Sequence, residues 1–97
     1  MHLQTDSMNR LFDTILSLQS REECRAYFED LCTIKELQDL SQRFQIATLL
    51  DQGLNYQSIA NEVDTSSTTI SRVNHCLNYG SGGYRAALSK LQARKES

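Results

Sequence analysis

The chain has 97 residues, of which 39% are hydrophobic and 23% are charged, and its formal net charge is −2 at pH 7. This length fits one small domain, and the composition is typical of a globular protein. No run of about 18 apolar residues occurs, which excludes a membrane-spanning helix, and the first residues lack the features of a secretory signal. We therefore expect one domain over residues 1–97, in the cytoplasm and with no membrane partner.

Proline is absent from the sequence, which has four glycines and three cysteines. The scarcity of turn-forming residues argues against an all-β chain and favours an all-α fold. Cys24, Cys32 and Cys76 form no CxxC pair, so a disulfide scaffold or a zinc ribbon is not expected, and a reducing cytoplasm fits best. The charge is −4 over residues 1–52 and +2 over residues 53–97. Any contact with nucleic acid should therefore come from the second half.

The first two predicted helices are amphipathic. Apolar residues at helical spacing between Leu11 and Leu16 predict a helix over about residues 7–19. Ser20 and Glu23 have the spacing of a capping box, in which a hydroxyl and a carboxylate satisfy free backbone amides. This pair predicts that a second helix starts at that point.

A third predicted helix opens with a second capping-box pair, Thr33 and Glu36, and should run to Gln52 and stop at Gly53. Its first half has one apolar stripe, but after Phe44 apolar residues fall on several faces. A helix that is apolar nearly all round is buried nearly all round, and one small chain can hardly surround it. We therefore expect a central helix packed by a partner subunit. The alternative is that some of its apolar residues are simply exposed.

Residues 56–75 have the spacing of a helix-turn-helix. The first helix of this motif needs an apolar residue followed by a very small one, because the second helix crosses closely there; Ile59 and Ala60 supply the pair. The second helix needs two inward residues three apart, which Ile70 and Val73 supply. The sharp turn falls on Asp64, a residue type that tolerates the left-handed conformation.

The second helix of this motif begins with a run of serine and threonine residues. Such residues are favourable at a helix N-cap, and exposed hydroxyls also suit phosphates and base edges in a major groove. A short polar helix with Arg72 and His75 on its outer side is typical of a DNA-reading helix. The residues expected to contact DNA are Gln57, Ser58, Ser66, Ser67, Thr68, Thr69, Ser71, Arg72 and His75. The alternative is an ordinary helical hairpin with a hydroxyl-rich capped start.

A glycine-rich break at residues 78–83 separates the motif from a last helix expected over about residues 84–93, which gives about six helices in all. Acidic pairs such as Glu22 and Glu23 are typical of solvated helix starts rather than of acid–base catalysis. The sequence contains no phosphate-binding glycine loop, HExxH or GxSxG motif. We therefore expect no enzyme activity, no metal site and no cofactor.

Three stretches of the chain resemble the Trp repressor family: LCTIKEL at residues 31–37, LSQR at residues 40–43 and TISRVNHCL at residues 69–77. The continuation to residue 80, CLNYG, resembles the Trp-repressor-related proteins of YerC/YecD type. The resemblance covers about residues 8–90 and implies an all-helical, intertwined homodimer whose two helix-turn-helix units dock in successive major grooves. It implies a sequence-specific transcriptional regulator of double-stranded DNA, expected to be a repressor. The alternative is a helical homodimer that acts as a protein-interaction adaptor without DNA binding.

The resemblance also implies a pocket for a small effector. In the Trp repressor an indole ring lies between two arginines; Arg43 and Arg72 occupy the matching positions, and Thr33 matches the threonine that opens the central helix. A glycine beside the second arginine is Val73 here, and a serine three residues later is Cys76. The first change removes space and the second weakens a hydrogen bond, so any effector is unidentified and not expected to be tryptophan. Alternatively, Arg43 only extends into solvent or pairs with the carboxylate four residues earlier.

Overall fold

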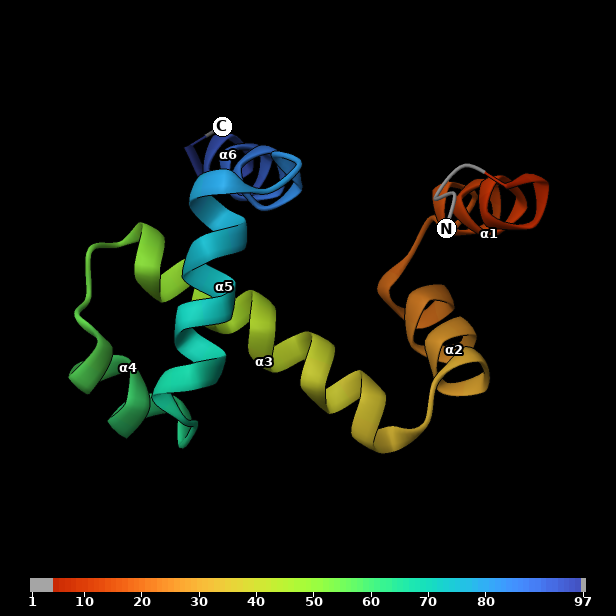
Figure 1. Ribbon diagram of the computed structural model, residues 1–97. Helices are drawn as coiled ribbons and strands as arrows, with labels where there is room; N and C mark the ends of the chain where they lie inside the picture. Colours follow the sequence, from red (N-terminus) through yellow and green to blue (C-terminus); the bar gives the residue numbers. More distant parts are fainter. Residues whose placement is uncertain (1–4, 97) are drawn as a thin grey trace. The chain divides into compact units, whose positions relative to one another are not determined.

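The computed structural model describes residues 5–96, which form six α-helices and, within that range, no β-strand (Figure 1). The helices are α1 (Asp6–Leu16), α2 (Arg21–Leu31), α3 (Ile34–Asp51), α4 (Tyr56–Val63), α5 (Ser67–Tyr79) and α6 (Gly83–Glu96). The expected all-α fold of about six helices is confirmed. No helix among these residues is both long and apolar enough to cross a membrane. The chain divides into two compact units, Met1–Leu37 and Gln38–Ser97, so that α3 begins in the first and ends in the second.

The first unit is built on α1 and α2. The Thr14 and Tyr27 hydroxyl oxygens lie 2.6 Å apart and join the two helices. α1 ends at Leu16, before the predicted end, because the chain must become extended at Ser20 to cap the next helix. Neither α1 nor α2 contains a buried side chain, and Leu16 is 81% exposed. The unit therefore has apolar side chains that it does not cover itself.

The two predicted capping boxes start the helices that they were expected to start. The backbone N–H of Glu23 donates to Ser20 Oγ at 3.0 Å, at the first turn of α2. At the start of α3 the exchange is complete: Thr33 N–H donates to Glu36 Oε1 at 2.8 Å, and Glu36 N–H donates to Thr33 Oγ1 at 3.1 Å. These bonds satisfy backbone amides that have no partner inside the helix.

α3 ends at Asp51, one residue before the predicted end, and Gly53 stops the helix as the sequence predicts. Gly53 has a φ of +89°, a left-handed conformation that favours glycine. Its N–H donates to Leu50 O at 3.0 Å, and the N–H of Leu54 donates to Leu49 O at 3.2 Å. This pair of bonds is the Schellman motif, which satisfies the last carbonyls of a helix. It turns the chain towards α4 and returns the half-buried Leu54 to the core.

The core of the second unit draws on all four of its helices. Its buried members are Ile46, Ala47, Ile59, Ile70 and Val73, with Leu49, Leu50, Leu54, Ala60, Val63, Tyr84 and Leu88 packed against them. Figure 1 shows α5 crossing the C-terminal half of α3, with α4 and α6 near its two ends. The complete burial of Ala47 rules out the alternative in which this residue is simply exposed.

The last helix is longer than the sequence predicts. α6 starts at Gly83 and continues to Glu96, past the predicted end at residue 93. The apolar pattern stops near that point, but arginine, lysine and glutamate, the residue types at positions 94–96, have good helix propensity.

Candidate nucleic-acid interface

The helix-turn-helix predicted over residues 56–75 corresponds to α4, a short turn and α5. Asn55 caps α4, since its Oδ1 accepts a hydrogen bond from Ser58 N–H at 2.9 Å. Asp64 adopts the left-handed conformation, with φ 56° and ψ 60°, and its N–H donates to Ala60 O at 3.0 Å. Among the residues described, it is the only non-glycine with a positive φ. The prediction that the turn falls on Asp64 is confirmed.

One face of α5 anchors the helix in the core. Ile70, Val73 and Leu77 are 0%, 4% and 5% exposed and recur at helical spacing. The opposite face is polar and exposed, and it contains Thr68, Ser71, Arg72 and His75. Arg72 and His75 thus lie on the outer side, as the sequence predicts. The packing of the inner face gives the outer face a fixed direction.

The hydroxyl-rich start of α5 performs two different tasks. Ser66 is the N-cap: its Oγ accepts from Thr69 N–H at 3.3 Å and lies 3.2 Å from Thr69 Oγ1. Thr69 is half-buried, whereas Ser67 and Thr68 are exposed in the first turn. Of the residues predicted to contact DNA, Ser66 and Thr69 therefore hold the helix start, and Ser67 and Thr68 have the more accessible hydroxyls.

The predicted contact residues on the other helix, Gln57 and Ser58, are exposed in the first turn of α4. The Gln57 side chain donates to Asn61 Oδ1 at 3.4 Å along the same helix. Across the motif, the side chain of Gln42 on α3 donates to the carbonyl of Val63 at 3.5 Å, where α4 ends. This bond links the turn to the central helix.

The charge of this surface is low. Over residues 56–79 the only arginine or lysine is Arg72, while Glu62 and Asp64 are acidic. A long-range positive potential is therefore absent from the motif, and binding to an anion there has to rely on hydrogen bonds and shape.

Tyr79 lies on the same outer side as His75, and it was not among the residues that the sequence was expected to present. Its side chain is 79% exposed, and the two rings are 5.3 Å apart and tilted by 42°. The signal was available in the sequence, because residues four apart share one face of a helix.

The residues expected to form the effector pocket lie in different structural surroundings. Thr33, in the first unit, is engaged in the cap of α3. Arg43 on α3 and Arg72 on α5, both in the second unit, are exposed. Val73 does not point into an open site but packs in the core cluster, and Cys76 is an exposed free thiol.

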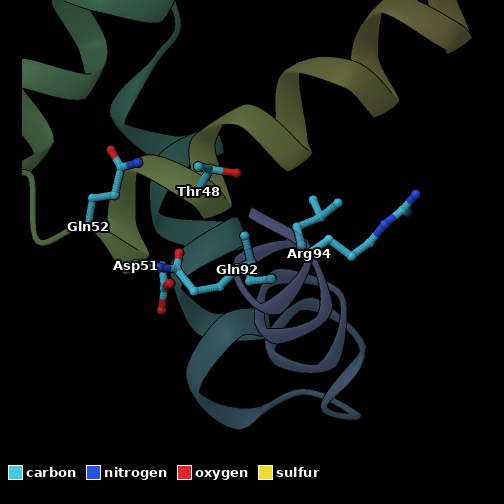
Figure 2. A pocket seen from close by; sticks show the side chains of 7 residues that line it. Thr48, Asp51, Gln52, Gln92 and Arg94 are labelled. Carbon is cyan, nitrogen blue, oxygen red and sulfur yellow. The ribbon is translucent and has the colours of Figure 1, made fainter. Parts of the chain in front are cut away.

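A groove that the sequence did not predict lies on the second unit between α3 and α6, with a volume of about 290 Å³ (Figure 2). It is lined by Thr48, Asp51, Gln52, Leu88, Leu91, Gln92 and Arg94. The groove is mixed in polarity. Its lining includes Asp51, which bonds to Arg85 nearby at 2.8 Å.

The chain is similar to several known proteins. The sequence profile of the Trp repressor protein family matches residues 6–92. Over 90 residues the chain is 46% identical to the uncharacterized protein YerC of Bacillus subtilis (strain 168), which covers 93% of this chain and 86% of that protein. A TrpR like protein from Eubacterium eligens has a similar crystal structure, with 44% identity, a TM-score of 0.90 and 93% of both chains covered. A candidate Trp repressor from Staphylococcus aureus shows 43% identity and a TM-score of 0.89, over 93% of this chain and 90% of that one.

Proposed function

Since the chain belongs to the Trp repressor protein family, we propose that it is a cytoplasmic transcriptional repressor that binds specific double-stranded DNA as a homodimer through α4 and α5. The observation that carries this proposal is the two-sided character of α5. Ile70, Val73 and Leu77 fix its inner face in the core, and its outer face presents hydroxyls and one guanidinium to solvent. An exposed polar helix held rigidly after a tight turn is the arrangement that reads base edges in a major groove.

The side chains on the outer face suit direct readout. Arg72 can donate two parallel hydrogen bonds to the O6 and N7 atoms of guanine, and the hydroxyls of Thr68 and Ser71 can donate to or accept from base edges. Ser67 and the free backbone amides of the first turn of α5 suit a phosphate. Because the motif has one arginine and no lysine, we expect weak non-specific affinity and a shallow dependence on salt.

The exposed apolar side chains of the first unit support the proposal of a homodimer. α1 and α2 bury no side chain, and Phe12, Leu16, Leu31 and Ile34 are exposed large apolar residues of that unit. Apolar surface of this kind marks a protein–protein interface, and a second copy of the chain supplies the same surface. Light scattering after size-exclusion chromatography should give twice the chain mass of 11.1 kDa. A folded monomer at micromolar concentration would contradict the dimer.

A protein-interaction adaptor is the rival function, and the low charge of the motif is the observation that favours it. Selection from a pool of random DNA duplexes separates the two. A DNA-binding dimer enriches a sequence with two half-sites about one helical turn apart. A pool that stays unenriched after repeated rounds would favour the adaptor.

We further propose that tryptophan is not the effector. Val73 is 4% exposed and packs in the core cluster, so a ring could enter at the position where the Trp repressor has a glycine only by displacing this side chain. Opening that space would disturb the packing of Ile46 and Ile70, which are completely buried. Such a change is costly in a close-packed core.

A further inference from the structure

Arg85 on α6 bonds to two other helices at once. Its Nη1 donates to Asp51 Oδ1 at the end of α3 over 2.8 Å, and its Nη2 donates to Asn78 Oδ1 in the last turn of α5 over 2.9 Å. Asn78 in turn donates through Nδ2 to the carbonyl and side-chain oxygens of Asn74, at 2.9 and 3.0 Å. We refer to Asp51, Arg85, Asn78 and Asn74 as the polar brace.

The connection between α5 and α6 constrains the same end of α5. The N–H of Gly80 donates to Cys76 O at 2.9 Å, and Gly82 has a φ of +87°. A Cβ at Gly80 would lie 2.3 Å from the Cys76 carbonyl oxygen, so the backbone fits closely there. α6 is thus tied to α5 both through this short corner and through Arg85.

Fold stability is a poor explanation of the brace. The side chains of Arg85 and Asp51 are 50% and 44% exposed, and exposed ion pairs contribute little to the free energy of unfolding. A planar guanidinium that donates to two acceptors in fixed directions instead restrains the orientation of the two helices that carry the acceptors. The brace is therefore better suited to orienting α5 than to holding the chain folded.

We propose that Arg85 is a positioning residue for DNA binding: by bridging Asp51 and Asn78 it sets the direction of α5 without requiring a bound effector. The buried inner face of α5 extends from Ile70 to Leu77, and the brace adds a directional polar attachment at Asn78 in the last turn. The buried face and the brace together define the axis of the helix, and the axis decides how the outer face meets base edges. This inference rests on the proposed DNA-binding function.

The test compares Arg85→Ala with Lys90→Ala, which removes the same charge from an exposed position on the same helix. The affinity of each variant is measured for the duplex that wild-type protein selects and for an unrelated duplex. Arg85→Ala should weaken the affinity for the selected duplex about five- to tenfold, the usual size of the coupling energy between residues in contact. Its affinity for the unrelated duplex should equal that of Lys90→Ala. Asn78→Ala should act in the same direction. Arg85→Lys, which keeps the charge but not the two-armed geometry, should fall between wild type and Arg85→Ala.

Hydrogen exchange without DNA separates a failure of this inference from a failure of the proposed function. The amides of residues 74–79 should exchange faster in Arg85→Ala than in Lys90→Ala, since local opening of the helix end becomes easier. If wild-type protein selects no duplex, the proposed function fails, and exchange alone decides whether the brace orders α5. Equal exchange in Arg85→Ala and Lys90→Ala, or an equal loss of affinity for the selected duplex, would overturn the inference.

Discussion

Alanine should have opposite effects at Gly80 and Gly83, two glycines at the corner between α5 and α6. At Gly80 an added Cβ would lie 2.3 Å from the oxygen and 3.1 Å from the carbon of the Cys76 carbonyl. This obstacle is backbone, and its oxygen accepts the N–H of Gly80 itself, so it cannot withdraw without loosening the last turn of α5. We expect Gly80→Ala to lower the free energy of unfolding by about 1–3 kcal/mol, the usual cost of overpacking.

Gly83 provides the matched control. Nothing lies within 4 Å of a Cβ built there, its φ is not in the left-handed region, and it is the first residue of α6. Alanine restricts the unfolded chain more than glycine does and also favours a helix. Gly83→Ala should therefore raise the free energy of unfolding by about 0.4–1 kcal/mol.

Thermal unfolding followed by far-ultraviolet circular dichroism measures both effects, with all proteins at one concentration because a dimer melts in a concentration-dependent way. Each kcal/mol corresponds to about 4–8 °C in Tm for a domain of this size. Wild type should melt between the two variants. A Gly80→Ala protein that melts at or above wild type would refute the steric reasoning. Equal shifts at both positions would show that the space around the added Cβ does not decide the effect.

Three further outcomes follow from the helix-turn-helix. Thr68→Ala and Arg72→Ala should each weaken binding of a selected duplex, for Arg72 by about 1–3 kcal/mol, with unchanged far-ultraviolet circular dichroism; full affinity in both would remove α5 from the interface. Ile59→Ala should cost about 2–5 kcal/mol in urea unfolding, because the residue is completely buried, and a loss below 1 kcal/mol would show that the core relaxes around it. Isothermal titration with L-tryptophan should detect no micromolar site, whereas one micromolar site per subunit with a gain in DNA affinity would contradict the role given to Val73.

Local chemistry explains what could be predicted from the sequence. The capping boxes at Ser20 and Thr33 and the left-handed Asp64 depend on residues close together in the chain, so their conformations follow from nearby side chains and backbone sterics. The inward face of α5 could be predicted equally well, because Ile70 and Val73 recur at helical spacing. Only helix ends without such signals, as at Leu16, were misplaced.

Features that depend on packing were not accessible in this way. Arg85 bonds to Asp51 across 34 residues, and no local pattern marks either residue as a partner. The serine and threonine run at the start of α5 indicated hydroxyls near DNA, but two of these hydroxyls take part in the cap, where Ser66 Oγ accepts from Thr69 N–H and lies 3.2 Å from Thr69 Oγ1. The residue types indicated a polar surface rich in hydroxyls. The contacts in the folded protein determine which of these residues stabilise the helix start and which are available to bind DNA.

Hydroxyl-radical footprinting on the most strongly enriched duplex tests most directly whether two copies of this chain read one DNA site through α5. Two symmetric copies should protect two patches about one helical turn apart, roughly 10 base pairs centre to centre, and Arg72→Ala should weaken both patches together. A single protected patch, two patches that Arg72→Ala leaves unchanged, or the absence of any enriched duplex would contradict DNA binding by a helix-turn-helix homodimer.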